Sequence, residues 1–362
     1  MKQRNKRVII WDTGEIDLIE GRQIGGIAVQ MYFWAQTFVE HGWEVYSFAE
    51  NARQRVVKEG ITFLPKRNVL RINLLLEWWD ALKTIAAIHP DLIIYRGANR
   101  ALYPLAKVAR LFGRKLVMFG ASDVNFEPGK ELVGSEVNRK MYHRAIKHIP
   151  YFVVQNQHQH DTLLQNYGKE SLVRFNIWGE VRQKPEDDVP QSDAVWVANF
   201  RTLKRAEWVL DAAEKLPEYK FVLAGGPSGD GKYYQEMKNR SEVLENLDFL
   251  GSRSFFYTCE LVARSKVLLC TSTFEGFPNT FLQAWVHGPP VISTVDPSGI
   301  ISRYHLGEVV NTEEELAAAL KHILDDKEYY EQLRQNVNAF FKENYSSEAG
   351  YNNIIQYVYE QD

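Results

Sequence analysis

Cysteine is nearly absent from this sequence, which has two, Cys259 and Cys270, among 362 residues. Two cysteines are too few for a disulfide framework or a zinc cluster, so a reducing cytoplasm is the expected compartment. Long apolar runs are also missing, since no stretch reaches the roughly 18 residues that would predict a membrane-spanning helix. The basic segment 1–7 leads through four apolar residues into Asp12, so we expect no signal peptide.

An excess of charge of one sign is lacking as well. The 43 basic and 46 acidic residues give a net charge of −3, which argues against a protein that coats nucleic acid, although a local basic patch is compatible with it. The sequence has no Gly-x-Gly-x-x-Gly, Walker-type or Asp-x-Asp motif, so it predicts neither a dinucleotide fingerprint nor a metal site. The missing fingerprint disfavours a dehydrogenase.

The sequence does contain 45% hydrophobic and 13% aromatic residues, enough for a full core in each of the two domains that its length predicts. Short apolar runs alternate with longer helical patterns, which indicates parallel sheets covered by helices on both faces. The expected strands are 7–11, 43–48, 61–64, 91–95, 115–119, 151–154, 194–198, 220–224, 266–270 and 291–293. The expected helices are 25–41, 74–88, 100–112, one that ends near 149, 206–215 and 281–287.

The alternation breaks at a polar, proline-containing segment, VRQKPEDDVPQSD (181–193), which has the composition of a linker. We therefore expect an α/β fold of two doubly wound parallel-sheet domains that face each other across a cleft. Their expected bounds are 1–185 and 190–345, with a C-terminal helix of about 346–362 that packs back on the first domain.

Ligands of open parallel sheets bind where the carboxyl ends of strands lead into helix N-termini, and two such loops have unusual residues. In the first, Gly25 and Gly26 open a helix, where paired glycines let backbone approach a ligand and free N–H groups attract an anion. The alternative is a glycine turn without a ligand. In the second, Arg201, Lys204 and Arg205 precede a helix whose dipole they oppose. Either an anionic ligand resolves that conflict or the cations are a solvated cluster.

A third loop, Glu-Gly-Phe-Pro-Asn, lies between an apolar strand and a short helix. Its Glu275 has the chemistry to bond a sugar hydroxyl, and the backbone N–H groups near Asn279 and Thr280 have the chemistry to hold phosphate. Gln283, one turn into the helix, has two interpretations. It either contacts a ligand or forms a capping box with Thr280, whose spacing the sequence matches.

Together these loops resemble family 4 retaining glycosyltransferases with the two-domain GT-B fold. Residues 271–294 have that family's Ser/Thr, Glu-Gly-Phe-Pro/Gly-Asn and Gly-x-Pro-Val pattern. Residues 197–217 are similar to its strand, loop and helix with a phosphate-binding Arg/Lys pair, and 221–234 and 247–255 match the strand-glycine segments that follow. Gly25-Gly26 corresponds to the glycine loop of the family's acceptor domain.

The resemblance implies a metal-independent hexosyltransferase without a cofactor, which moves a sugar from a UDP or GDP donor to a saccharide and retains its configuration. Lys204 would neutralise the leaving diphosphate, Glu275 would hold the donor sugar's hydroxyls, and Gln283 would contact the ribose. The donor phosphate itself would take the acceptor's proton. The other residues implied to bind donor or acceptor are Gly25, Gly26, Asn199, Arg201, Gly225, Ser252, Arg253, Gly276, Phe277, Asn279 and Thr280.

Three departures from the family pattern leave alternatives open. Gln283 replaces the family's second Glu, and Asn199 stands where its Arg is usual, so Arg201 is the proposed substitute. The segment FGASDVNF (119–126) lacks the common His, and its Asp123 either orients a substrate hydroxyl or is a turn residue. A nucleotide-sugar binding protein without turnover and another GT-B enzyme, such as a sugar-nucleotide epimerase, therefore remain as alternatives to an enzyme of surface polysaccharide synthesis.

The stretch KRNVLRINLLLEWW (66–79) places three cations ahead of a helix rich in Leu and Trp. Leu75, Trp78, Trp79 and Leu82 recur at helical spacing, so one interpretation assigns them to the core. The other is an interfacial anchor, because cations beside an apolar helix face are attracted to an anionic membrane. We hypothesise peripheral attachment to the cytoplasmic membrane face and a lipid-linked saccharide acceptor.

Overall fold

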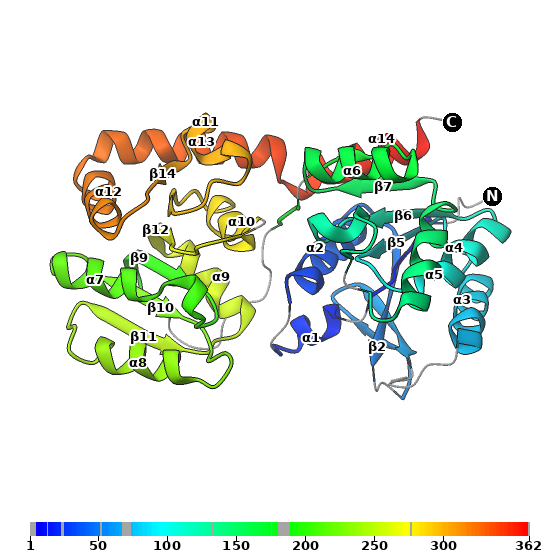
Figure 1. Ribbon diagram of the computed structural model, residues 1–362, viewed down its shortest axis with the longest axis horizontal. Helices are drawn as coiled ribbons and strands as arrows, with labels where there is room; N and C mark the ends of the chain where they lie inside the picture. The colour runs from blue at the N-terminus through cyan, green and yellow to red at the C-terminus, as the bar shows by residue number, and fades with distance from the viewer. Residues whose placement is uncertain are drawn as a thin grey trace. The chain divides into compact units, whose positions relative to one another are not determined.

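The computed structural model describes residues 5–12, 14–22, 25–50, 53–66, 74–131, 133–174, 176–179, 189–275 and 277–360. They form two compact units, Met1–Ile177 with Ser347–Asp362, and Trp178–Ser346 (Figure 1). Each unit is a largely parallel sheet with helices on it, so the α/β prediction with two parallel sheets is confirmed. Among the described residues, no helix combines the length and the apolar character needed to cross a membrane.

The sheet of the first unit has the strand order β3-β4-β2-β1-β5-β6-β7-β8. Its pairs are parallel except for β3 and β4, which run antiparallel. Since β2 lies on one side of β1 and β5 on the other, the strand order reverses at β1. The strands are β1 (Arg7–Ile10), β2 (Glu44–Glu50), β3 (Val56–Lys58), β4 (Ile61–Lys66), β5 (Leu92–Arg96), β6 (Lys115–Phe119), β7 (Tyr151–Val154) and β8 (Leu172–Val173).

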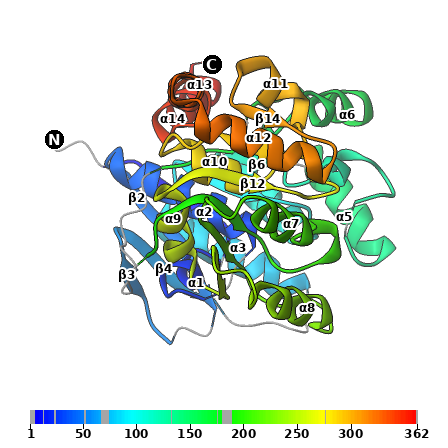
Figure 2. The same cartoon turned by 90° about the vertical axis from the view of Figure 1, so that its left-hand side faces the viewer.

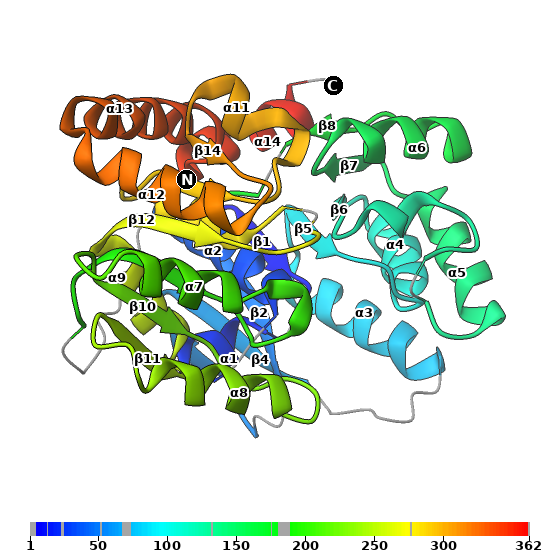
Figure 3. The same cartoon turned by 60° about the vertical axis from the view of Figure 1, so that its left-hand side comes forward.

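Helices cover both faces of this sheet. On β6, Leu116 and Met118 join the core beneath α3, α4 and α5, while Phe119 meets Trp34 of α2 with ring centroids 5.2 Å apart. Figure 3 shows α3, α4 and α5 as a row of neighbours. The helices are α1 (Glu15–Ile19), α2 (Gly26–Glu40), α3 (Leu74–Ile88), α4 (Leu102–Leu111), the 3-10 helix η1 (Asp123–Phe126), α5 (Glu136–Ile146), α6 (Gln157–Tyr167) and α14 (Ser347–Tyr359).

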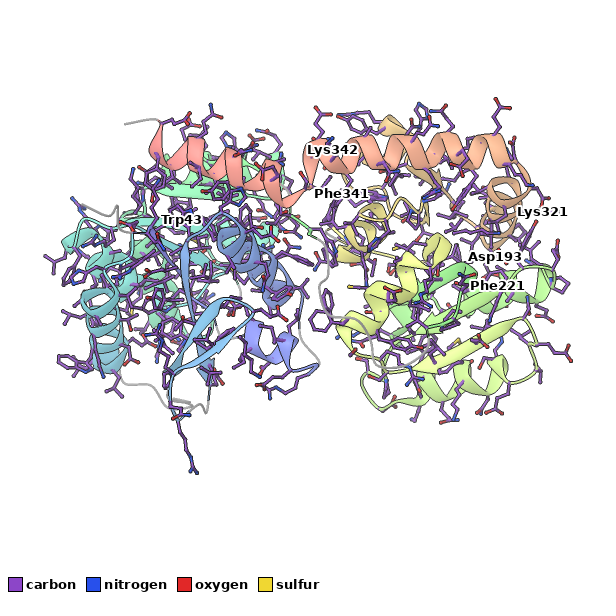
Figure 4. The ribbon with its side chains drawn as sticks, turned by 180° about the vertical axis from the view of Figure 1, so that it is seen from behind. Trp43, Asp193, Phe221, Lys321, Phe341 and Lys342 are labelled. Carbon is purple, nitrogen blue, oxygen red and sulfur yellow. The ribbon has the colours of Figure 1, made fainter. Side chains whose placement is uncertain are left out.

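The last helix, α14, packs on α2 in the first unit. The indole N–H of Trp43, labelled in Figure 4, donates to the Tyr351 hydroxyl at 2.9 Å, and the His41 ring stacks on Tyr351 with centroids 3.6 Å apart. The Lys115 ammonium donates to the Val358 carbonyl at 2.6 Å. These contacts tie both ends of α14 to the first unit.

The sheet of the second unit has the order β11-β10-β9-β12-β13-β14 and is parallel throughout. Its first strand, β9, lies between β10 and β12, so the strand order reverses there, as it does at β1 in the first unit. The strands are β9 (Ser192–Val197), β10 (Phe221–Ala224), β11 (Leu247–Gly251), β12 (Ser265–Cys270), β13 (Val291–Ser293) and β14 (Gly307–Val309).

In Figure 2, α7 and α12 lie on the face of this sheet that is turned to the viewer, and they share its main apolar core. Helices α9 and α10 pack together, and α9 contacts β9 and β12. The helices are η2 (Thr202–Lys204), α7 (Glu207–Lys215), α8 (Lys232–Ser241), α9 (Phe255–Ala263), α10 (Asn279–Trp285), η3 (Pro297–Gly299), α11 (Ile300–Tyr304), α12 (Glu313–Asp325) and α13 (Lys327–Asn344).

Several features differ from expectation. The helices and strands that were not predicted are α1, α6, α8, α9, α11, α12, α13, β3, β8 and β14. The single helix expected to end near residue 149 is instead η1 followed by α5, because Pro128 and Gly129 interrupt the pattern and Ser135 starts a new helix by accepting from the Asn138 N–H.

The core interpretation of the apolar residues on α3 is wrong for most of them. Leu75, Trp79 and Leu82 are 71%, 61% and 37% exposed, whereas Ala81 and Ile85 face the core. The three exposed residues follow one helical stripe, but the stripe that packs on the first unit is the neighbouring one. Residues 67–73, which include Arg67 and Arg71 of the same segment, lie outside the described part of the chain.

Candidate functional site

Two loops meet in the second unit where its strand order reverses. Strands β9 and β12 are parallel neighbours, with Val195 beside Leu268. Their carboxyl ends therefore reach the same edge of the sheet, and η2 follows one strand while the loop to α10 follows the other. Such a reversal leaves a crevice at the carboxyl edge, where ligands of doubly wound sheets bind.

Hydrogen bonds join the two loops into one structure. The Thr271 hydroxyl donates to the Lys204 carbonyl at 2.6 Å and accepts from the Trp196 indole N–H at 3.1 Å. The Thr273 N–H donates to the Leu203 carbonyl at 2.8 Å. These bonds fix the backbone of residue 204 against the end of β12, independently of the lysine side chain.

The side chains of Lys204 and Glu275 form an ion pair at this edge, from the Lys204 Nζ to the Glu275 Oε1. The Ser272 hydroxyl donates to the same carboxylate oxygen at 2.9 Å. Both side chains of the pair are about one-fifth exposed, at 21% and 20%. The structure therefore brings together the two residues predicted to bind the leaving phosphate and the sugar hydroxyls.

The two arginines beside Lys204 differ in their contacts. Arg205 turns into the protein, donates to the Thr271 carbonyl at 2.6 Å and lies 4.0 Å from the ring centre of Trp208. Burial lowers its pKa from the ordinary value. Arg201 is exposed and donates to the Ser228 hydroxyl at 3.0 Å. Arg205 thus stabilises the fold of this loop, and only Arg201 and Lys204 of the predicted cationic cluster remain as candidates for binding an anion.

Asn199, Gly225 and Ser252 follow the neighbouring strands β9, β10 and β11, and lie close together. A Cβ atom on Gly225 would lie 1.7 Å from the Ala198 carbonyl oxygen, so only glycine fits there. A Cβ on Gly226 would lie 3.4 Å from the Ser252 Oγ and 3.8 Å from the Asn199 Oδ1. Three residues predicted to bind the donor therefore share one corner of the same edge.

Arg253 and Phe277 make aromatic contacts. The Arg253 guanidinium lies 5.3 Å from the ring centre of Tyr257. The Phe277 ring stacks on Tyr345 with centroids 5.5 Å apart. Gly276, between Glu275 and Phe277, lies outside the described residues.

Gln283 is buried and bonded inside the second unit. Its amide nitrogen donates to the Thr258 Oγ1 and to the Cys259 Sγ, both at 3.3 Å. The capping-box alternative is wrong, because α10 begins at Asn279 after Pro278 and has no side-chain cap, which places Thr280 already inside the helix. The observed bonds cross from α10 to α9.

We expect Gln283→Glu to keep the affinity for a nucleotide donor, because a carboxylate also accepts from a ribose hydroxyl. The variant loses the bond to Thr258, whose hydroxyl donates to the Phe255 carbonyl at 2.8 Å, and should therefore lose some stability. Gln283→Leu should lose the α9 bonds and about 1 kcal/mol or more of unfolding free energy. Thermal melts with and without nucleotide separate the two effects. A loss of donor affinity in folded Gln283→Glu would exclude the ribose role.

The predicted residues of the first unit lie at the carboxyl edge of its sheet. Gly25 caps α2 and Gly26 is its first residue, and both are exposed. Asp123 is exposed and begins η1, where its Oδ1 accepts from the Asn156 and Gln159 side-chain amides, each at 2.9 Å. Ser122, and not Asp123, caps η1. The two amides orient the Asp123 carboxylate without burying it.

Gly25 and Gly225 form a matched pair of glycines for mutation. A Cβ on Gly25 would meet nothing within 4 Å, and its φ of −90° suits any residue, so neither space nor backbone requires glycine there. We expect Gly25→Ala to leave the melting temperature nearly unchanged but to weaken transfer, if a substrate approaches this backbone. Gly225→Ala should destabilise the second unit strongly. Full transfer activity in Gly25→Ala would remove this loop from the site.

Glu15 is a buried carboxyl group that the sequence did not single out, since the short helix α1 was not expected. Neither of its oxygens has a hydrogen-bond partner among the described residues. Burial, and next the Asp12 carboxylate, raise its pKa well above the ordinary value, and they outweigh its own backbone, the Ser47 hydroxyl and Lys66, which act in the opposite sense. The folded state therefore holds this carboxyl group neutral over part of the pH range in which the unfolded chain ionises it.

The raised pKa predicts a loss of stability with rising pH. The advantage of the neutral form is complete below the unfolded pKa of about 4.3 and is lost as the pH rises through the folded pKa, at up to about 1.4 kcal/mol per pH unit. Glu15→Gln should therefore raise the melting temperature at pH 8 more than at pH 4. The exposed Glu50→Gln is the control, and an equal shift in both variants would contradict the assignment.

Comparison with known proteins finds similarity to glycosyltransferases over part of the chain. Residues 179–340 match the family model of "Glycosyl transferases group 1". The Vi polysaccharide biosynthesis protein VipC/TviE of Salmonella typhi is 33% identical over 139 residues, 36% of this chain and 22% of that protein. An uncharacterized glycosyltransferase of Methanocaldococcus jannaschii is 23% identical over 241 residues, 60% of this chain and 58% of that protein. The chain thus matches only part of the length of these curated relatives.

A glycosyltransferase from Rickettsia africae has a similar structure, with a TM-score of 0.71 at 13% identity over 99% of this chain and 100% of that one. This likeness shows the fold, which is two parallel-sheet α/β units of the GT-B class, as predicted. The matched family segment contains all of β9 to β12 and therefore both loops that hold Lys204 and Glu275. Among the described residues, no group of three or more His, Cys, Asp or Glu side chains has the arrangement of a metal site.

Proposed function

We propose that this protein is a retaining, metal-independent hexosyltransferase of the family 4 type, which transfers a sugar from a nucleotide diphosphate donor to a saccharide acceptor. The observation that carries the proposal is the Lys204–Glu275 pair where the strand order reverses in a group 1 glycosyltransferase domain. A cation and a carboxylate side by side suit a donor that presents phosphate next to sugar hydroxyls.

In this proposal the protein acts by stabilising charge. The bond from the sugar's anomeric carbon to the diphosphate breaks, a bond from that carbon to the acceptor oxygen forms, the donor phosphate takes the acceptor's proton, and negative charge grows on the leaving oxygen. Lys204 and Arg201 would stabilise that charge, and Glu275 would hold the sugar's hydroxyls. Asn199 and Ser252, at the neighbouring strand ends, would lie toward the nucleotide.

The acceptor is proposed to be a saccharide of a surface polysaccharide. The relative from Salmonella typhi is named for polysaccharide biosynthesis, which supports this class of acceptor. On the first unit, the exposed Asp123 would bond an acceptor hydroxyl, held in place by Asn156 and Gln159. The exposed N-terminus of α2 at Gly25 and Gly26 would approach a substrate through its backbone.

We further propose that α3 contacts a membrane and that the acceptor is lipid-linked. Leu75, Leu76 and Trp79 are 71%, 45% and 61% exposed on this helix. A contiguous apolar face of this kind is unusual on a protein surface and is typical of an interaction site. The chain contributes cations at Lys66, Arg67 and Arg71 just before it, which would favour an anionic, cytoplasmic membrane face.

A ligand screen tests the donor. The purified chain is melted with UDP-, GDP- and ADP-sugars, and a donor at a hundred times its dissociation constant should stabilise by about 2.7 kcal/mol. The stabilising donor is then incubated with saccharide acceptors, with and without EDTA. Transfer with retained configuration supports the proposal. Binding without transfer or slow donor hydrolysis indicates a binding protein, and conversion of the donor without an acceptor indicates an epimerase.

Vesicle flotation tests the membrane contact. The parent should float with anionic vesicles at low salt, and both Trp79→Ser and a variant with Lys66, Arg67 and Arg71 changed to Glu should float much less. Val57→Ser is the control, because Val57 is 63% exposed in the same unit but lies on β3. No flotation of the parent would refute the membrane contact without affecting the donor assignment.

A further inference from the structure

A pocket of about 380 Å³ opens in the first unit, away from the residues discussed so far. Its lining comes from the end of α4 and from the segments that lead into three adjacent strands. Arg114 directly precedes β6, Lys147 and His148 precede β7, and Lys169 precedes β8. The pocket therefore lies where these strands begin, whereas Asp123 follows the end of β6. A small ligand fits a volume of this size.

Basic side chains line this pocket without any acidic one among them. The basic residues are Arg110, Arg114, Lys147, His148 and Lys169. All of the lining residues are described, and none is an Asp or Glu. No ion pair engages any of these five side chains within the described part of the chain, whereas Arg7 of the same unit, for example, pairs with Glu44 at 2.7 Å. This concentration of positive charge occurs in a chain whose net charge is −3.

The internal hydrogen bonds leave donors available to a ligand. Arg110 lies 3.4 Å from the His148 Nδ1 and donates to it when the imidazole is neutral. Lys169 donates to the Ile149 carbonyl at 3.3 Å. The Arg114 Nε is buried and has no hydrogen-bond partner among the described residues. A buried donor without an acceptor is costly.

The positive charges around the pocket also affect the pKa of His148. Burial lowers its pKa, and Lys107, Arg110 and Lys169 lower it further. No carboxylate among the described residues counteracts them. An anion bound among these cations would act in the opposite sense and raise the pKa of the imidazole.

We propose that this pocket is a binding site for a phosphate group, carried either by a soluble phosphate compound or by the headgroup of an anionic lipid. Guanidinium and ammonium donors converging on one small volume match the charge and the several acceptor oxygens of a phosphate better than those of a single carboxylate. Because ligands of the transfer reaction belong at the opposite, carboxyl edge of the sheet, the site is separate from the proposed transfer site and does not depend on it.

Titration of the intact chain with inorganic phosphate and with pyrophosphate tests the proposal. Calorimetry should show saturable binding that weakens with added sodium chloride, and NMR should show the His148 pKa rising as the anion binds. Replacing Arg114 and Lys147 together by Gln should weaken binding about tenfold or more. The exposed Lys147→Gln alone is the second variant, with a smaller loss, in case the double variant does not fold.

The control removes two charges elsewhere in the unit, with the exposed Arg53 and Lys83 changed to Gln. Binding unaffected by this control but lost in the pocket variant supports the site. An equal loss in both variants, or no saturable binding of either anion with no movement of the His148 pKa, would overturn it.

Vesicles distinguish the source of the phosphate. Flotation is compared on phosphatidylglycerol and phosphatidylcholine vesicles in a Trp79→Ser background, so that α3 contributes little. Selective flotation on phosphatidylglycerol that the pocket variant loses identifies a lipid headgroup. Phosphate or pyrophosphate binding without such flotation identifies a soluble phosphate compound.

Discussion

Lys204→Ala is expected to lower turnover roughly 10²–10³-fold, the scale of losing one preorganised donor to a developing negative charge. The backbone of residue 204 should stay in place, because its carbonyl is held by the Thr271 hydroxyl and not by the lysine side chain. Since both side chains of the ion pair are only about one-fifth exposed, the variant leaves the Glu275 carboxylate without its cation and should also lose some stability. Steady-state kinetics with the stabilising donor and a thermal melt measure both quantities.

The matched control is Lys321→Ala, which removes an exposed lysine that pairs with Asp325 and Glu218 in the same unit. This variant should keep full turnover. If Lys204→Ala stays within a few-fold of the parent, or if both variants lose activity only in proportion to a lower melting temperature, then Lys204 has no role in stabilising the leaving diphosphate.

Glu275→Gln should lose about two orders of magnitude in turnover while it leaves the fold intact. The amide has the shape of the carboxylate and can still accept the Ser272 hydrogen bond, which measures 2.9 Å in the parent. It lacks the charge that pairs with Lys204 and that strengthens hydrogen bonds to sugar hydroxyls. The kinetics should therefore change far more than the melting temperature.

A double-mutant cycle separates a joint role of the pair from two independent ones. If Lys204 and Glu275 act on the same donor, the losses of the two single variants should not add in the double variant. Normal transfer by Glu275→Gln would remove this carboxylate from the site. Ser272→Ala serves as a milder comparison, because it removes one bond to Glu275 without removing charge.

Much of the fold is readable from the sequence because its strands are buried apolar runs and most of its helices span several turns. Helix α1 has five residues and β3 has three, which is too short for a periodic pattern to stand out. The exposed stripe of α3 shows a different limit. Helical spacing finds a stripe of apolar residues but does not say whether it packs on the protein or faces outward, as Leu75 and Trp79 do.

The sequence predicts which loops form the candidate site, but it does not predict which side chains contact each other there. Charged residues that follow strands, together with the family resemblance, identified residues 201, 204 and 275 in the sequence. The pairing of Lys204 with Glu275 joins positions 71 residues apart and depends on β9 and β12 being neighbours. Gln283 matched a capping box in sequence, yet its amide bonds α9, because α10 begins one residue before Thr280. In the sequence, Arg205 has the same position before a helix as Arg201, but in the structure its guanidinium packs on the Trp208 ring.

Calorimetric titration of the parent and of Lys204→Ala with UDP and with GDP shows whether this edge of the sheet binds a nucleotide diphosphate. We expect one of the two nucleotides to bind the parent and to bind the variant about tenfold or more weakly, because a charge-assisted contact to the diphosphate is lost. Binding of neither nucleotide to the folded parent, or equal affinity for parent and variant, would contradict a nucleotide diphosphate site at the Lys204–Glu275 edge.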